Sequence, residues 1–236
     1  MKKNTETNPR SGMIFPEELF DFDTTSCGES FEHQGLFEGI GYVWEALARL
    51  ASYIETYLEK SLHQHNANIM PGAIVGPHVV LGADVTVEPH VYIKGPALIG
   101  DRTEIRHGTY IRENVIIGRD CVIGKSAEIK HAIVMDGAKA SHWNYVGDSI
   151  LGFDVNLGAG VKLSNKKITN DEIRIRDIDG TVYQTGLQKL GAIIGDGTQI
   201  GCNAVLNPGI LLGKRCLVYP LTSVRQTYFH NEVIKR

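Results

Sequence analysis

The fold is decided by residues 69–129, which read IMPGAIVGPHVVLGADVTVEPHVYIKGPALIGDRTEIRHGTYIRENVIIGRDCVIGKSAEI. An aliphatic residue occupies every sixth position of this stretch without exception. These residues are Ile69, Val75, Leu81, Val87, Ile93, Ile99, Ile105, Ile111, Ile117, Ile123 and Ile129. A small or β-branched residue stands two positions before each one, beginning with Ala73 before Val75. Because residues two apart in a strand share a face, each hexad predicts a short strand with two inward side chains.

Turn-forming residues fill the rest of each hexad. Glycine follows the aliphatic residue directly at Gly76, Gly82, Gly100, Gly118 and Gly124, with Pro, Asp and Asn common just after it. Three such hexads can close one triangular coil, whose strands then pair with those of the next coil. The sequence therefore predicts an all-β solenoid, a parallel β-helix of hexapeptide repeats.

The composition fits one continuous solenoid core. The chain has 236 residues, of which 42% are hydrophobic, and a net charge of −3. That charge, without a basic run carrying interleaved aromatic residues, argues against a nucleic-acid partner. No stretch approaches the roughly 20 apolar residues of a membrane span, and no targeting signal opens the chain. Cys27, Cys121, Cys202 and Cys216 lack metal-site spacing, so we interpret them as reduced cysteines of a cytoplasmic protein.

Two segments depart from the hexad pattern and set the expected domains. In residues 1–68 we expect a disordered polar tail followed by an amphipathic helix between Phe37 and Leu62, which would be a cap or a packing element for the first coil. Residues 69–236 are the expected β-helix domain, interrupted by an insertion at 164–191. The insertion contains EIRIRDIDGTVYQTG, two alternating runs that predict a β-hairpin. Such an insertion either contributes to a binding face or forms an arm that contacts a neighbouring subunit.

The regular repeat slips twice. The hexads from Ile129 to Val134 and from Val146 to Leu151 are each one residue short. Between these slips lies SHWNYVGD, residues 141–148, with His142 as a titratable side chain. Breaks in an otherwise regular pattern are often functional, so this region is the first candidate for a site.

Three cations also fall into register. Lys94, Arg112 and Lys130 stand 18 residues apart, at one corner of three successive coils. Their backbones should be about 4.8 Å apart per step. Stacked cations at this spacing repel one another, so the ladder is either simply solvated or holds an anion such as a phosphate. The residues alone leave both interpretations open.

Residues 128–165, EIKHAIVMDGAKASHWNYVGDSILGFDVNLGAGVKLSN, resemble one known family, including both short hexads. It is the acetyltransferase domain of the bifunctional N-acetylglucosamine-1-phosphate uridylyltransferase/glucosamine-1-phosphate acetyltransferases. The resemblance covers about residues 69–224 and is specific over 112–165. It implies a left-handed β-helix, a homotrimer, acetyl-CoA as co-substrate, and no metal in acetyl transfer. Because the first 68 residues hold no Gly-rich phosphate loop, we expect no uridylyltransferase domain in them, and the residues leave open whether a separate protein supplies uridylyl transfer.

The resemblance assigns a role to each matching residue. It makes His142 the catalytic base, and an amine of pKa near 8 needs such a base at pH 7. It assigns binding of the amino-sugar 1-phosphate to Arg112, Lys130, Tyr145, Asn156 and Lys189. It places Ala159, Asn165 and Cys202 near acetyl-CoA. The chain departs from the family at Lys166 instead of an aromatic residue, Cys202 instead of serine and Pro220 instead of alanine. These departures concern coenzyme contacts more than the chemistry.

Other interpretations compete with this one. An acyltransferase of lipid A synthesis shares the fold and a catalytic histidine, although the cation ladder favours a sugar phosphate. A trimeric β-helix carbonic anhydrase would hold zinc between facing coils, but His90, His107 and His131 do not share a coil register. The non-enzymatic alternative is a scaffold descended from a nucleotidyltransferase tail.

Overall fold

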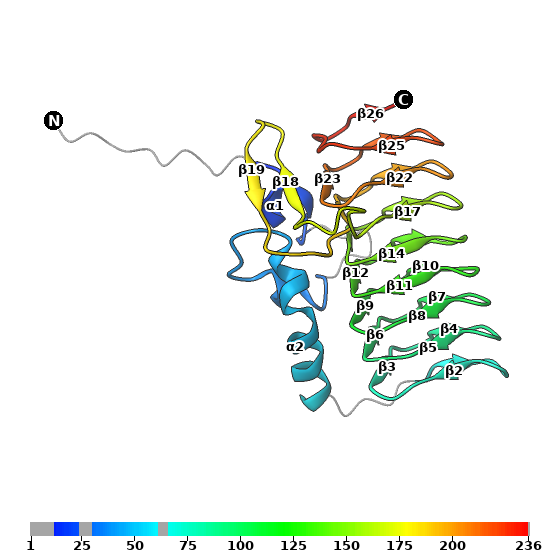
Figure 1. The fold of residues 1–236 in the computed structure, drawn as a ribbon. Coiled ribbons are helices and arrows are strands. Elements are labelled where there is room, and N and C mark those ends of the chain that lie inside the picture. Colours follow the sequence, from blue (N-terminus) through cyan, green and yellow to red (C-terminus); the bar gives the residue numbers. More distant parts are fainter. Residues whose placement is uncertain (1–11, 24–29, 61–65, 236) are drawn as a thin grey trace.

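The protein is described here from a computed structural model, which places residues 12–23, 30–60 and 66–235. The chain winds into a triangular prism of stacked coils, and each coil contributes one short strand to each of three parallel sheets (Figure 1). This confirms the predicted fold class, a left-handed parallel β-helix of hexapeptide repeats. The expected tail at residues 1–11, Cys27 and Leu62 lie outside the described residues.

The three sheets are named A, B and C in chain order. Sheet A comprises β1 (Asn68–Ile69), β4 (Thr86–Val87), β7 (Glu104–Ile105), β10 (Val122–Ile123), β13 (Lys139–Ala140), β16 (Asn156–Leu157), β21 (Gln199–Ile200), β24 (Leu217–Val218) and β26 (Val233–Ile234). Sheet B comprises β2 (Ile74–Val75), β5 (Tyr92–Ile93), β8 (Tyr110–Ile111), β11 (Glu128–Lys130), β14 (Tyr145–Gly147), β17 (Lys162–Leu163), β22 (Val205–Leu206) and β25 (Ser223–Val224). Sheet C comprises β3 (Val79–Leu81), β6 (Ala97–Ile99), β9 (Val115–Ile117), β12 (Ala132–Val134), β15 (Ile150–Leu151), β20 (Ala192–Ile194) and β23 (Ile210–Leu212). The turns between sheets form three edges, called AB, BC and CA.

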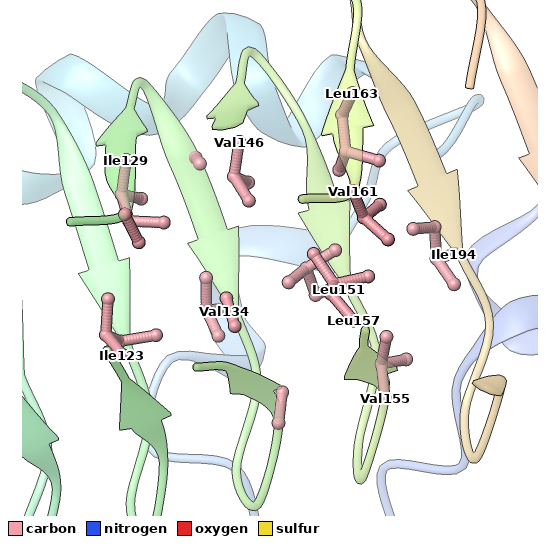
Figure 2. Packing of buried hydrophobic residues seen from close by; sticks show 14 of the residues in the cluster. Ile123, Ile129, Val134, Val146, Leu151, Val155, Leu157, Val161, Leu163 and Ile194 are labelled. Carbon is pink, nitrogen blue, oxygen red and sulfur yellow. The ribbon is translucent and has the colours of Figure 1, made fainter. Parts of the chain in front are cut away.

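The inward side chains of the hexads fill the prism. Ile123, Ile129 and Val134 point inward from one coil, and Val146 and Leu151 continue the column in the next (Figure 2). Each of these five side chains is fully buried. Burying one such aliphatic side chain stabilises a fold by about 1.5–3 kcal/mol, so the repeat itself supplies the driving force.

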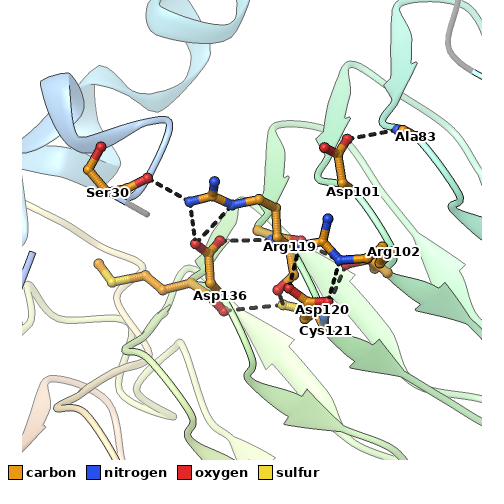
Figure 3. Close-up of polar contacts among 11 residues, drawn as sticks. Ser30, Ala83, Asp101, Arg102, Arg119, Asp120, Cys121 and Asp136 are labelled. Carbon is orange, nitrogen blue, oxygen red and sulfur yellow. Dashed lines mark hydrogen bonds and ion pairs between the residues drawn. The ribbon is translucent and has the colours of Figure 1, made fainter. Parts of the chain in front are cut away.

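The CA edge is held by aspartates that reach back to the preceding coil. Asp101 Oδ1 accepts a hydrogen bond from the Ala83 amide at 2.7 Å, and Asp136 Oδ1 accepts one from the Arg119 amide at 2.7 Å (Figure 3). Glycine is required at Gly118 in this arrangement, because a Cβ there would collide with the Asp136 carboxylate. Arg119 also pairs with Asp136 at 2.8 Å and donates to the Ser30 carbonyl at 2.6 Å, which ties the N-terminal segment to the coils.

The outward face of sheet C is covered by the chain's own N-terminal segment. This segment contains α1 (Pro16–Leu19), the 3₁₀ helix η1 (Gln34–Phe37) and α2 (Glu45–Lys60). The buried side chains of α2 pack in one cluster with an outward aliphatic stripe of sheet C, one residue per coil. The stripe consists of Leu98, Ile116, Ile133, Ile150, Ile193 and Leu211.

The position of α2 therefore differs from the expected cap over the first coil. In Figure 1 the helix lies along the column of β3, β6, β9 and β12, beside the prism. The reason is the stripe, since an aliphatic residue on the outside of every third strand must be covered. The first coil keeps exposed aliphatic side chains at Ile69 and Ile74.

The predicted hairpin is present as the antiparallel pair β18 (Arg174–Arg176) and β19 (Val182–Gln184). It packs on its own chain. Ile173 and Ile175 are fully buried in the cluster that contains α2. The Tyr183 ring lies 5.5 Å from the Tyr42 ring, measured between centroids. The hairpin is thus ordered within one chain, by the same apolar surface that holds the N-terminal segment.

Candidate active site

The two short hexads both shorten the BC edge. Strand pairs on either side of them step by 17 residues, as in Ile117 with Val134 and Ile129 with Val146. The turn after β11 is therefore reduced to His131, and the turn after β14 to Asp148 and Ser149. Each tightened turn has a residue in the left-handed region, His131 at φ 45° and Asp148 at φ 48°. The slips place Lys130 directly against Asp148, whose amide donates to the Lys130 carbonyl at 3.0 Å.

The predicted cation ladder is present on this edge, but it is paired with acids. Lys94 Nζ lies 3.2 Å from Glu113 Oε2. Arg112 bonds Glu128 Oε1 at 3.0 Å and lies 3.7 Å from Glu113 Oε1, and Lys130 Nζ lies 3.5 Å from Asp148 Oδ2. Carboxylates, rather than solvent alone, offset the repulsion between the stacked cations. We call Arg112, Glu113, Glu128, Lys130, Tyr145, Asp148 and Asn165 the ionic cluster.

Tyr145, in β14, and Asn165, just after β17, complete the cluster toward the C-terminal coils. Asn165 Nδ2 donates to Asp148 Oδ2 at 2.5 Å, and the Asn165 side chain also hydrogen-bonds the Tyr145 hydroxyl. Gly147 is the next step of the ladder above Lys130. A Cβ there would lie 2.6 Å from the Tyr145 hydroxyl and 2.8 Å from Asn165 Nδ2. The glycine thus leaves the space in which these two side chains meet.

The cluster shifts the ionisation of its members. The hydrogen bond to Glu128 raises the pKa of Arg112, which stays a cation. Burial raises the pKa of Tyr145, and the nearby charges of Glu128 and Asp148 raise it further. Burial alone would raise the pKa of Glu113, but its own amide and Lys94 outweigh it, so that the pKa lies below its ordinary value. At neutral pH Arg112 and Glu113 are therefore charged, and the Tyr145 phenol is neutral.

His142 lies on the other border of sheet B, at the AB edge, and its side chain is exposed. Its turn is tied to the next coil by Asn144, which is 2% exposed. Asn144 Oδ1 accepts from the His142 amide at 3.0 Å, and Asn144 Nδ2 donates to the Gly158 carbonyl at 2.8 Å. The His142 carbonyl accepts from the Gly160 amide at 2.9 Å. The imidazole is presented to solvent by a rigid turn, with the exposed Trp143 ring 6.3 Å away.

An apolar groove continues from this edge over sheet A. Its volume is about 420 Å³. It is lined by Asn156, Gly158, Gln199, Ile200, Gly201, Cys202, Leu217, Val218, Tyr219 and Pro220. The substituted residue Pro220 packs on Gly201, where any Cβ would collide with the proline ring. Cys202 is exposed as a free thiol. The groove is thus open although Cys202 and Pro220 differ from the family, and both residues belong to its lining.

The structure therefore sorts the predicted site residues into two groups within one chain. Arg112, Lys130 and Tyr145 lie together in the ionic cluster, and Asn165 joins them rather than the groove. His142, Ala159, Asn156 and Cys202 lie along the AB edge and sheet A, with the Ala159 carbonyl accepting from the Asn203 amide at 2.9 Å. The exposed Lys189 precedes Leu190, whose amide donates to the Asn165 carbonyl at 2.9 Å.

Four residues of the site were not found by sequence reasoning. They are Glu113, Glu128, Asn144 and Asp148. For Glu128 and Asp148 a signal existed, since both lie beside a slip and within three residues of a predicted ligand. Glu113 and Asn144 resemble ordinary turn residues and give no such signal.

The histidines weighed as zinc ligands are divided between two edges. The rings of His90 and His107 lie 5.2 Å apart, whereas His131 lies at the BC edge. Within the described ranges, no three His, Cys, Asp or Glu side chains gather in a metal-binding group.

No helix of the described part of the chain is long and apolar enough to cross a bilayer.

Comparison with known proteins places this geometry in context. Residues 93–184 match the family model described as the GMPPB C-terminal domain, and residues 191–219 match a hexapeptide repeat of succinyl-transferase. A bifunctional sugar-1-phosphate nucleotidylyltransferase/acetyltransferase of Sulfurisphaera tokodaii is 36% identical over 63% of this chain and 41% of its own length. The bifunctional protein GlmU of Methanococcus vannielii is 30% identical over 79% of this chain and 44% of its own length.

The chain is a relative of these bifunctional enzymes. The resemblance expected from residues 128–165 is thereby confirmed, although the chain spans only about two fifths of the length of these relatives. Among solved structures, LpxA from Acinetobacter baumannii covers 73% of this chain and 67% of its own, with a TM-score of 0.53 and 11% identity. At that identity the likeness supports the fold alone.

Proposed function

We propose that this relative of the bifunctional enzymes is an N-acetyltransferase. It would transfer the acetyl group of acetyl-CoA to the amine of an amino-sugar 1-phosphate, with glucosamine 1-phosphate as the expected acceptor. The observation that carries the proposal is the arrangement on sheet B. A histidine presented by a rigid turn borders one side of the sheet, and the ionic cluster, which includes Tyr145, borders the other.

The ionic cluster matches the charges of such an acceptor. An amino-sugar phosphate carries an ammonium group and a phosphate, and the cluster offers both carboxylates and cations. The Arg112 pairs are the ones that a phosphate can exchange, because both partners are about one-third exposed and surface pairs contribute only about 0–1 kcal/mol. The Lys130 and Asp148 side chains are 14% and 9% exposed, so their pair should persist. Arg112 would thus bind the phosphate directly, with Lys130 and Lys189 adding positive charge.

The chemistry requires few groups. The deprotonated amine attacks the thioester carbonyl, a C–N bond forms, and the C–S bond breaks to release coenzyme A. His142 would accept the amine proton and return it to the leaving thiolate. In this assignment Asn156 contacts the substrate, while the groove near Ala159 and Cys202 receives acetyl-CoA. No metal enters these steps.

The assembly and setting are part of the proposal. A homotrimer is expected from the resemblance, and it is supported by a contrast between the sheets. Sheet C is covered by the chain itself, whereas the outer faces of sheets A and B carry exposed residues such as Tyr92 and Leu217. The free thiols of Cys121, Cys202 and Cys216 fit the reducing cytoplasm. The product would enter nucleotide-sugar synthesis.

A thiol-release assay tests the proposal. Purified protein is given acetyl-CoA with glucosamine 1-phosphate, galactosamine 1-phosphate or the corresponding free sugars. We expect turnover with a sugar 1-phosphate that exceeds turnover with its free sugar. Coenzyme A release with none of the four acceptors would reject the enzyme and favour a non-catalytic scaffold.

A further inference from the structure

A carboxylate that the repeat does not require is buried in the ionic cluster. Asp148 occupies a turn position at φ 48°, where Asn or Gly would serve the backbone equally well. Its side chain is only 9% exposed. A buried carboxylate is costly unless it is paired and hydrogen-bonded. The contacts of the Asp148 carboxylate should therefore show which neighbouring side chains require a negative charge at this turn.

Asp148 contacts two candidate site residues through one oxygen. Oδ2 lies 3.5 Å from Lys130 Nζ and accepts from Asn165 Nδ2 at 2.5 Å. The backbone of Asp148 is held from both sides as well. Its amide donates to the Lys130 carbonyl at 3.0 Å, and its carbonyl accepts from the Gly191 amide at 2.7 Å. The carboxylate is thus fixed in position between the coil below and the end of the insertion.

The orientation of the Asn165 amide follows from this contact. A carboxylate can only accept hydrogen bonds, so the NH₂ group of Asn165 must face it. The same side chain also bonds the Tyr145 hydroxyl. The Oδ1 atom of Asn165 has two lone pairs and is not the atom that contacts Asp148, so it can accept a hydrogen bond from a ligand. A sugar hydroxyl or an ammonium group supplies such a donor.

We propose that Asp148 is a positioning residue for acetyl transfer, which presents the Asn165 carbonyl oxygen to the acceptor sugar and holds the Lys130 ammonium in place. The inference rests on the proposed function. It assigns Asn165 to the acceptor sugar, since its side-chain partners belong to the ionic cluster and the coenzyme groove is lined by other residues.

The substitution Asp148→Asn tests this role. Asparagine keeps the shape of the Asp148 side chain, but its NH₂ group can donate to Asn165 Oδ1. The side-chain amide of Asn165 is then no longer held in one orientation. The substitution also removes the negative charge beside Lys130. The turnover number with glucosamine 1-phosphate should fall roughly tenfold or more, with KM for acetyl-CoA changed less than about twofold. Inorganic phosphate should bind about two- to tenfold more tightly in calorimetry, because the cluster gains net positive charge. A merely loosened fold would weaken phosphate binding instead.

Asp136→Asn is the matched control. Asp136 is also a buried carboxylate, 2% exposed and paired with a cation, but it lies at the CA edge. This variant should lower the unfolding temperature and leave both kinetic constants within about twofold. If Asp148→Asn likewise kept its turnover and phosphate affinity, the positioning role would be rejected while the proposed function stood. If the wild-type protein turned over no amino-sugar phosphate, the proposed function would be rejected and the positioning role with it.

Discussion

At the scale of single residues, Arg112 is the cation of the ionic cluster that an incoming phosphate reaches most easily, because its acidic partners are surface groups. Arg112→Ala should raise KM for an amino-sugar 1-phosphate about tenfold or more, and should hardly change the slow reaction with the free amino sugar. Steady-state kinetics on both acceptors measure this. Arg102→Ala removes a more exposed ion pair, at the CA edge, and should change neither value. Equal losses on both acceptors would contradict the phosphate role.

The acids of the cluster show where residue-level prediction stopped. Spacing alone predicted the stacking of Lys94, Arg112 and Lys130, because the coil period fixes which backbones are adjacent. Spacing could not predict that Glu113 and Glu128 pair with them, since pairing depends on side-chain direction at a turn. The roles of His142 and its neighbours came from the resemblance and not from periodicity, and they remain predictions.

The buried carboxyl group of Asp196 should make the protein less stable against unfolding as pH rises. Its carboxylate accepts from the Asp21 amide at 2.7 Å and the Phe153 amide at 2.9 Å, yet burial raises its pKa to about 6. The folded protein therefore holds this proton more tightly than the unfolded chain. The contribution to the free energy of unfolding is greatest below pH about 4 and is lost as pH rises through 6, a change of about 3 kcal/mol.

Asp196→Asn isolates that contribution. Thermal unfolding of both proteins between pH 4 and pH 7 should show a smaller decline with rising pH in the variant, because the asparagine does not titrate. Other titrating groups are common to both proteins and cancel in the comparison. Parallel curves for the two proteins would show that Asp196 is not the source.

At the scale of elements, the outward stripe on sheet C explains why the coils were predictable and the helix position was not. Inward positions repeat every six residues, and they gave the strands directly. The stripe repeats only once per coil, at residues such as Leu98, Ile116 and Ile133, while the matching positions of sheets A and B hold residues such as Glu104 and Tyr110. Examining every third hexad separately would have predicted a covered sheet, and hence a lateral place for α2.

The hairpin should depend on the same apolar cluster. Ile175 is fully buried in it, so Ile175→Ala should cost about 2–4 kcal/mol, as large-to-small core substitutions do. Ile178, in the turn of the same hairpin, is 47% exposed, and Ile178→Ala should change stability by less than about 0.5 kcal/mol. Chemical denaturation of the two variants measures the difference. Similar values for both would mean that the hairpin does not share the core.

At the scale of the whole molecule, one chain leaves two of its three sheets uncovered. A homotrimer would bury part of these faces, and a flat-sided prism suits closed threefold symmetry. Light scattering at micromolar concentration should give three times the chain mass of 26.0 kDa. A mass of one chain would contradict the trimer.

The central claim is that one histidine at the AB edge removes the proton of an amine bound across sheet B. The pH dependence of the turnover number, compared between wild type and His142→Ala, tests it most directly. The account predicts a fall of about 10² to 10⁴ at pH 7, with acetyl-CoA affinity little changed, and convergence of the two rates as pH passes the pKa of the substrate amine. A variant that kept more than about a third of wild-type turnover at pH 7 would contradict the claim.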